Sequence, residues 1–328
     1  MSPKPVSKIS AKLNSLAVVV CSFLYLTTCH AATIEEARAA YTRDDYMQAF
    51  SLASDLARKN NDPDARNMLA GLLFTGKGPS KDINAAMKIW TDLARQDYAA
   101  AQATLGGLYL DGTALGASDY EKAKYYLELS AAHDDPTSIY NLGFMHESGL
   151  GVPQSISQAI GYYEKSAQLN YAKALFRLGS LNANHLIPNG SPESACQYYE
   201  KAAKAGLGEG AFLTGKCLAT GVGMPKNLPL ATQWYTQAAM LDVPQAQANL
   251  GYIFEKGLGQ AVNLPEAYKW YWLASSRVPE AAKRLGVIEQ EAPSIGHSAN
   301  EQVKTAWRQE IQNFIKEDNN RRGLLINK

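Results

Sequence analysis

A short glycine-bearing motif returns along most of this chain at an almost constant spacing. Its second residue falls at Ala70, Gly106, Gly143, Gly179, Gly215, Gly251 and Gly286. The steps between these positions are 36, 37, 36, 36, 36 and 35 residues. A second motif stays in phase with it, as in AIGYYEKSA from Ala159 and ATQWYTQAA from Ala231. A fixed period of this length predicts a repeat solenoid, in which stacked neighbouring units build the core.

Each unit reads as two α-helices. The first presents alanine, leucine and glycine on one stripe, which lets a neighbouring helix approach closely. It ends at glycines such as Gly149 and Gly151, as a left-handed helix end requires. The second helix begins behind a residue that can cap it, and these are Asp45, Asp82, Asp119, Ser155, Ser191, Asn227 and Asn263. No stretch alternates with a period of two for long, so we expect no strands.

The two motifs resemble the Sel1-like repeat, a relative of the tetratricopeptide repeat. Ala101 to Tyr109 and Ala246 to Gly259 carry its first half, and Asn227 to Ala239 carries its second. The resemblance implies an all-α fold, a right-handed α-solenoid of stacked antiparallel helix pairs in a Sel1-like, tetratricopeptide-like superhelix. The fourth unit departs from the pattern, because His185 and Ile187 stand where glycines are expected.

We expect additional elements at both ends of the array. The predicted order is a signal peptide (1–31), an N-terminal tetratricopeptide-like capping helix pair (33–61), a Sel1-like array of about six repeats and a partial one (62–290), a linker (291–297), a C-terminal capping helix (298–318) and a tail (319–328). The sequence Ser298-Ala299-Asn300-Glu301 is a candidate capping box for the last helix. That helix has an apolar face, expected to cover the last open repeat, made of Val303, Trp307, Ile311, Phe314 and Ile315. Its other face, expected to meet water, carries Gln309, Gln312 and Lys316.

The N-terminal segment has the features of a secretion signal. Lys4, Lys8 and Lys12 precede an apolar run over residues 16–26, which is too short to span a bilayer. Cleavage after Ala31 is the first expectation. A lipoprotein signal is the alternative, because Leu26-Thr27-Thr28-Cys29 resembles a lipobox, and it would place a lipid anchor at Cys29. Either reading predicts an exported protein, periplasmic first, with an outer-membrane lipoprotein or a secreted protein as alternatives.

Charge gives no reason to expect a nucleic-acid partner. The full chain carries 32 basic and 31 acidic residues. Removing the three signal-peptide lysines leaves 29 basic against 31 acidic residues, a net charge of −2. Nucleic-acid binding needs clustered Lys and Arg, and here both signs are interspersed. No second apolar stretch is long enough to predict a membrane span.

Two of the four cysteines remain outside the signal region. Cys196 lies eleven residues before Leu207, where two helices are expected to turn, and Cys217 lies ten residues after it. An antiparallel helix pair would bring both to the same height, so an oxidising compartment favours a disulfide between adjacent units. Two buried free thiols are the alternative.

No catalytic, cofactor or metal motif is present. The chain has no Gly-rich phosphate loop between a strand and a helix, no H-E-x-x-H and no G-x-S-x-G. Some members of the resembled family bind or hydrolyse β-lactams, but S-x-x-K, S-D-N and K-T-G are also absent. The pairs His133-Asp134 and His146-Glu147 read as solvated helix ends. We therefore expect no enzyme activity, cofactor or metal.

Positions that vary between repeats are candidates for a partner surface, whereas the repeated aromatic pairs of the second helices are expected to pack between units. The candidates on the first helices are Arg66, Gln102, Tyr140, Asn141, Phe144, Phe176, Arg177, Phe212, Gln247, Asn249 and Tyr252. A concave face with such side chains would suit an extended peptide or a partner's helix.

Three functions remain open from the sequence. The first is a non-enzymatic protein–protein interaction scaffold or adaptor of the bacterial envelope, with its partner on the concave face. The second is a cell-wall or β-lactam-directed hydrolase or binder, which rests on the family resemblance alone. The third is a secreted host-interaction effector. The sequence separates the first from the second by the missing catalytic motifs, and it does not separate the first from the third.

Overall fold

The computed structural model describes residues 33–322. The predicted signal peptide, its cleavage site, the lipid-anchor position Cys29 and the end of the predicted tail, residues 323–328, lie outside the described residues. The chain divides into two compact units, one up to Ala86 and one from Met87, which are described separately. Across residues 33–322 there are seventeen α-helices, one short 3-10 helix and no strand, which confirms the all-α prediction.

The first unit holds α2 (Ile34–Thr42), α3 (Tyr46–Asn60) and α4 (Pro63–Thr75). Thr33 and Glu36 form a capping box at the start of α2. The expected N-terminal helix pair corresponds to α2 and α3. Arg38 of α2 pairs with Asp64 of α4 at 2.9 Å between Nη2 and Oδ2. The unit boundary falls inside α5 (Ile83–Arg95).

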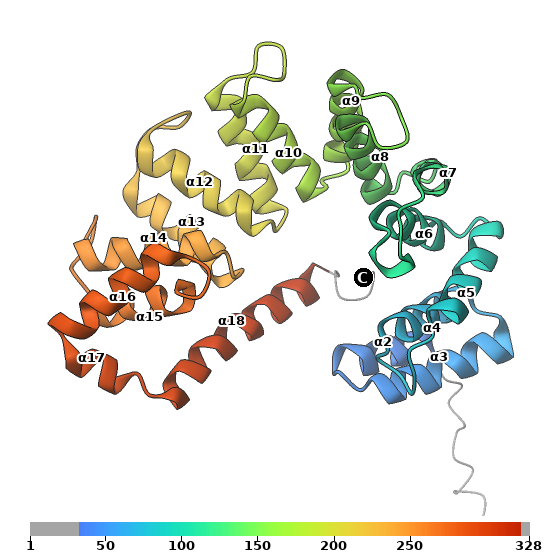
Figure 1. Cartoon of the computed structure of the whole chain (residues 1–328), viewed down its shortest axis with the longest axis horizontal. Helices are drawn as coiled ribbons and strands as arrows, with labels where there is room; N and C mark the ends of the chain where they lie inside the picture. The colour runs from blue at the N-terminus through green and yellow to red at the C-terminus, as the bar shows by residue number, and fades with distance from the viewer. Residues whose placement is uncertain (1–32, 323–328) are drawn as a thin grey trace, which may run out of the picture. The chain divides into compact units, whose positions relative to one another are not determined.

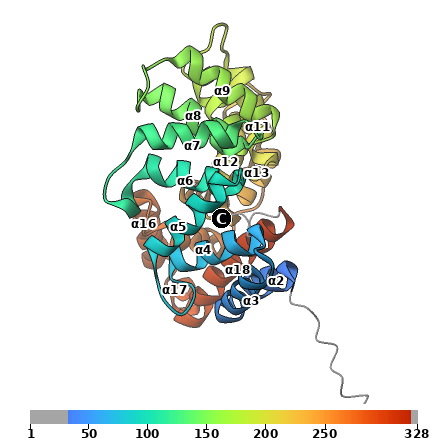
Figure 2. The same ribbon diagram turned by 90° about the vertical axis from the view of Figure 1, so that its right-hand side faces the viewer.

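The second unit continues as a series of helix pairs, in which each first helix packs on the second helix of its own pair. The pairs are α6 (Ala99–Asp111) with α7 (Tyr120–Ala131), α8 (Pro136–Ser148) with α9 (Ile156–Gln168), α10 (Ala172–Ala183) with α11 (Pro192–Lys204), α12 (Gly208–Thr220) with α13 (Leu228–Met240), and α14 (Pro244–Lys256) with α15 (Leu264–Ala274). Figure 2 shows α6 to α9 stacked in chain order. The 3-10 helix, Thr113–Leu115, lies between α6 and α7.

The helix ends follow the predicted signals. Every predicted capping residue accepts a backbone N–H of the first turn; for example, Asp119 accepts from Lys122 and Asn263 accepts from Glu266. Several first helices end at a glycine with positive φ, such as Gly149 at 69°. In the degenerate fourth unit, His185 has φ 54° and so takes a left-handed conformation next to the end of α10 without a glycine.

The repeated glycine lies where the two helices of a pair touch. A Cβ built at Gly143 would lie 2.8 Å from the ring of Tyr163, and one at Gly251 would lie 2.6 Å from the ring of Tyr271. The last copy, Gly286, has nothing within 4 Å of that position. The glycine therefore makes room for the second-helix aromatic ring, which is buried. We expected these rings to pack between units, but the ring lies against the first helix of its own unit. The exposed fractions are 0% for Tyr163, 7% for Tyr199, 4% for Tyr235 and 2% for Tyr271.

A disulfide joins the fourth and fifth repeats. Cys196 of α11 and Cys217 of α12 are bonded, with their Cα atoms 6.2 Å apart. Both are buried beside Phe176 and Tyr199. This confirms the predicted pairing and excludes the alternative of two free thiols.

The C-terminal region differs from the sequence-based expectation in three ways. The expected linker contains a short helix, α17 (Pro293–Ser298), after α16 (Pro279–Glu291). The last helix, α18 (Glu301–Arg321), is capped by Asn300, whose side chain accepts from the Val303 N–H. Ser298 instead ends α17 and donates to the Ser294 carbonyl, so the capping-box prediction is wrong.

The apolar face of α18 also covers more than the last repeat. Ile311 is 5% exposed, and α18 packs against α15 and α13. Lys269 of α15 pairs with Glu310 at 2.9 Å, and Arg322 donates to the Lys204 carbonyl at 3.2 Å, beside the turn that follows α11. Figure 1 shows this helix running back along the second unit. The helix α18 lies against second helices because outward side chains of those helices contact it. Trp272 of α15, for example, contacts Trp307 of α18.

No helix within residues 33–322 is long and apolar enough to cross a membrane.

Candidate partner-binding surface

The first helices of the third to sixth repeats carry aromatic and polar side chains at the surface. Phe144 is 39% exposed and Tyr252 is 50% exposed, and each directly follows its repeat's buried glycine. Successive helical residues are turned by about 100°, so the residue after the buried glycine points away from the second helix. We call this surface the first-helix face, and its predicted members in α8, α10, α12 and α14 are Tyr140, Asn141, Phe144, Phe176, Arg177, Phe212, Asn249 and Tyr252.

Three aromatic residues of the first-helix face are held by rings of the second helices. Tyr140 lies 5.3 Å from Tyr163, measured between ring centroids, and Phe176 and Phe212 make equivalent contacts at 5.6 and 5.9 Å. All three are half-buried. Each ring is therefore fixed on one side by its own repeat, which reduces the side-chain entropy lost when a partner binds.

Arg177 is held by a carboxylate of the preceding repeat. Its Nε lies 2.9 Å from Oε2 of Glu147, which also accepts the Tyr163 hydroxyl at 2.6 Å. Burial alone would raise the pKa of Glu147, but the hydrogen bonds from Arg177 and Tyr163 outweigh it and lower that pKa. The prediction that Glu147 ends a solvated helix is wrong, since its side chain is only 10% exposed. The Arg177 side chain is 41% exposed, so it keeps a surface toward solvent.

The same three-residue link recurs at the sixth repeat. The Glu255 carboxylate accepts Tyr271 of its own repeat at 2.8 Å and Arg284 of α16 at 3.0 Å. Burial would raise the pKa of Glu255, but bonds from Arg284, Lys256 and Tyr271 hold it at about 2. Each link joins two helices of one repeat to the first helix of the next.

Gln102 and Gln247 do not belong to the surface, which corrects their assignment. They are 1% and 0% exposed, and each donates through Nε2 to a carbonyl of the preceding second helix. Each also donates to an aspartate that has positive φ in the preceding turn, Asp97 and Asp242 respectively. A polar side chain in the core has to be satisfied by such bonds, so these glutamines fix the turn between repeats.

The aspartates of these two turns also contact a basic residue one repeat later. Asp97 lies 2.8 Å from His133 Nε2, and Asp242 lies 2.9 Å from Arg277 Nη1. Our reading of the sequence missed both arrangements. The sequence pattern that predicts them is an aspartate with a glutamine five residues later. A histidine or arginine then follows the aspartate by 36 or 35 residues.

Arg66 lies on α4 in the first unit and is half-buried. The first-helix face is defined on the second unit, so Arg66 is not one of its members.

The first-helix face offers aromatic rings, two amides and a guanidinium, which are groups suited to binding. Within the described part of the chain, no group of three or more His, Cys, Asp or Glu side chains could hold a metal ion. Exposed rings on a rigid helix array suit the burial of a partner's apolar side chains, and amide and guanidinium groups suit a peptide backbone or a carboxylate.

The repeat pattern matches the family model of the Sel1 repeat at six successive segments. These are residues 63–98, 99–135, 136–171, 172–207, 208–243 and 244–277. They cover most of the chain and coincide with the helix pairs from α4–α5 to α14–α15. The chain belongs to the Sel1-repeat family.

Solved structures share the fold. A Sel1 repeat protein from Oxalobacter formigenes is 26% identical, with a TM-score of 0.66, and the match covers 75% of this chain and all of that one. The protein c5321, described as a protective antigen of uropathogenic Escherichia coli with this repeat fold, is 20% identical. Its TM-score is 0.62, over 92% of this chain and 64% of that chain.

Among curated proteins, human protein sel-1 homolog 2 is 26% identical over 133 residues, which is 40% of this chain and 18% of that protein. The chain spans less than a fifth of the length of the curated relatives it matches. Family and fold together define this chain as a Sel1-repeat protein built of stacked helix pairs.

Proposed function

We propose that this chain is a non-enzymatic scaffold or adaptor of the bacterial envelope that binds a protein partner on its first-helix face. The observation that carries this proposal is the presence of two exposed rings, Phe144 and Tyr252, on first helices whose neighbouring rings are fixed by their own repeats. Large rings that stay at a rigid surface are typical anchors for a protein partner.

The proposed envelope location is supported by the disulfide between Cys196 and Cys217. Structural disulfides persist in oxidising compartments such as the periplasm and are rare in the cytosol. The location is tested by separating cells into cytoplasm, periplasm, outer membrane and medium, and recovery in the cytoplasm alone would contradict it.

Site-specific crosslinking tests the partner surface. A photoreactive amino acid is placed in intact cells at Phe144, at Tyr252 or, as a control, at Tyr125, which is 58% exposed on the second helix α7. We expect the same discrete crosslinked species from positions 144 and 252 and none from position 125. Crosslinks at position 125 alone, or at no position under several growth conditions, would contradict the proposal.

A complementary variant separates binding from folding. Replacing Tyr252 with Ala removes an exposed ring without opening the core, so stability should change by less than about 0.5 kcal/mol. Affinity for the crosslinked partner should fall about tenfold or more if the ring is an anchor. The matched control Tyr125→Ala should leave affinity unchanged.

A further inference from the structure

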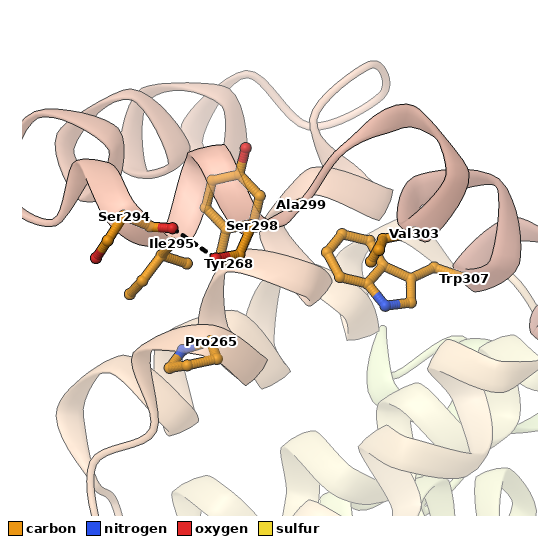
Figure 3. Close-up of a pocket in the computed structure, with 8 residues that line it drawn as sticks. All are labelled: Pro265, Tyr268, Ser294, Ile295, Ser298, Ala299, Val303 and Trp307. Atoms are coloured by element: carbon orange, nitrogen blue, oxygen red, sulfur yellow. Dashed lines mark hydrogen bonds between the residues drawn. The ribbon is translucent and has the colours of Figure 1, made fainter.

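A small cavity opens between α15, α17 and α18 at the C-terminal end of the second unit. Its volume is about 260 Å³, and Figure 3 shows the side chains around it. The walls are mainly apolar, formed by Pro265, Tyr268, Ile295, Val303 and Trp307, with two serines of α17 at the edge. Because pockets for drug-sized ligands usually measure about 300 Å³ or more, this one suits a smaller molecule.

Two aromatic rings form adjacent walls of the cavity. The Tyr268 and Trp307 centroids lie 6.5 Å apart, with the ring planes at 61°. Nearby indole rings in this part of the molecule already hold cations. Arg308 Cζ lies 4.5 Å from the centroid of Trp272, and Lys269 Nζ lies 5.1 Å from that of Trp270. No Lys or Arg of residues 33–322 is placed in this way over Tyr268 or Trp307.

An exposed carboxylate without a counter-ion is connected to the cavity wall through the Tyr268 hydroxyl, although it does not itself line the cavity. Glu289 of α16 accepts the Tyr268 hydroxyl at 2.7 Å, and it forms no ion pair with any cation of the described chain. It lies close to α17, since a Cβ built at Gly296 would be 3.4 Å from Glu289 Cγ and 3.9 Å from the Tyr268 oxygen. A second carboxylate, Glu301, is exposed and forms an ion pair with Lys304, with 3.3 Å between Oε1 and Nζ.

We propose that this cavity, formed by Tyr268, Trp307 and their apolar neighbours with Glu289 beside it, binds a small organic ammonium ion with an apolar body. The apolar walls would bury the body of the ligand. The ring faces and the Glu289 carboxylate would both favour its positive charge. A neutral ligand would gain only the apolar contact, and an anion would meet an unpaired carboxylate. This site is separate from the first-helix face and does not depend on the proposed scaffold function.

The test uses three ligands of nearly one shape and different charge. Benzylammonium, benzyl alcohol and benzoate are titrated into the full exported chain at pH 7, and the indole N–H signals are followed by NMR. The Trp307 signal is assigned with Trp307→Phe. We expect a saturable shift of the Trp307 signal, with benzylammonium binding about fivefold more tightly than benzyl alcohol and benzoate binding most weakly.

Glu289→Gln distinguishes the contribution of the carboxylate charge from that of the cavity shape. Glutamine removes the charge but keeps an acceptor for the Tyr268 hydroxyl. We expect it to weaken benzylammonium binding about threefold and to leave benzyl alcohol binding unchanged. Glu291→Gln, at the exposed end of the same helix, is the matched control and should change neither. Equal affinity for the ammonium and the alcohol, an unchanged affinity in Glu289→Gln, or no saturable shift would each overturn the proposal.

Discussion

At the residue scale, the two adjacent glycines of α6 have different environments although both belong to the repeat motif. A Cβ at Gly106 would lie 2.7 Å from the Leu127 side chain and 3.1 Å from its backbone nitrogen. A Cβ at Gly107 would meet nothing within 4 Å. In α6, packing against Leu127 therefore requires glycine at position 106, whereas position 107 has room for a larger helix-forming residue.

We therefore expect opposite effects from the two alanine substitutions. Gly106→Ala should lower the free energy of unfolding by about 1–3 kcal/mol, since the α6–α7 pair has to separate to admit the methyl group. Gly107→Ala should raise it by roughly 0.5–1 kcal/mol through helix propensity. Urea denaturation followed by circular dichroism measures both, and a loss of equal size in the two variants would contradict this account.

The Glu255 link makes stability depend on pH. Its pKa is about 2 in the folded chain against an ordinary value of 4.5, so its stabilising contribution is fully present above about pH 4.5. The contribution is lost as the pH falls from there through about 2. We expect Glu255→Gln to destabilise the protein by about 3 kcal/mol at pH 7, because Arg284 loses its buried partner. The loss should shrink toward pH 2.

Chemical denaturation at pH 7, 4 and 3 measures this trend. The control Glu280→Gln removes an exposed pair with Lys283, in which both side chains are more than 70% exposed, and should show almost no effect at any pH. A Glu255→Gln penalty that stays constant between pH 7 and 3 would show that charge is not its cause.

At the element scale, each helix pair is defined by its capping residues and its glycine. Successive pairs are connected by different contacts, including a disulfide and buried carboxylate links. The joint between α11 and α12 is the one that carries a disulfide. It follows the fourth repeat's irregular loop, where His185 and Asn189 both have positive φ. A covalent bond beside an irregular loop limits the local opening of that joint.

Reduction should therefore loosen this joint first. The bond closes a segment with a sequence separation of 21 residues, for which chain-entropy reasoning gives about 3 kcal/mol of stabilisation. Hydrogen exchange after reduction should rise in α10 to α12 before it rises in α6 to α9 or in α14, because stacked repeats couple mainly to their neighbours. The double variant Cys196→Ser with Cys217→Ser should show the same pattern and no response to reductant. Free thiols in protein isolated without reductant, found by alkylation and mass spectrometry, would contradict the bond.

At the scale of the whole molecule, α18 connects repeats that are distant in sequence. Its contacts include Lys269 in the sixth repeat and the Lys204 carbonyl in the fourth. Lys269 is 41 residues from its partner Glu310, and Lys204 is 118 residues from its partner Arg322. The helix α18 therefore contacts the array across three repeats and does not cover only the last one.

Removing residues 300–328 should expose the outward surfaces of α13 and α15. We expect faster hydrogen exchange in α13 to α16, little change in α6 to α9, and a greater tendency to associate, since uncapped repeat arrays expose apolar surface. Gln312→Ala, on the exposed face of α18, is the control and should change none of these. Equal loss of protection across all repeats would show that the second unit unfolds as one cooperative block.

The sequence by itself determined the features that repeat or act locally. The period fixed the helix pairs, and each capping residue acts within its own first turn, so Asp119 and Asn263 could be assigned without coordinates. The buried aromatic positions followed from the same spacing, because a regular stack repeats equivalent environments. The Cys196–Cys217 pairing followed from their nearly equal distances to the turn at Leu207.

Only the tertiary structure decided the features that depend on contacts between repeats. Gln102 and Gln247 vary between repeats as surface residues do, yet they are buried, and their Nε2 groups donate to an aspartate of the preceding turn and to a carbonyl of the preceding second helix. The path of α18 and the cavity beside Trp307 likewise arise between segments whose spacing carries no period. The Glu147 and Glu255 links do keep the repeat register, but only the structure shows that each carboxylate meets a tyrosine and an arginine. Periodicity determines which residues are equivalent, and side-chain packing determines which of them are exposed.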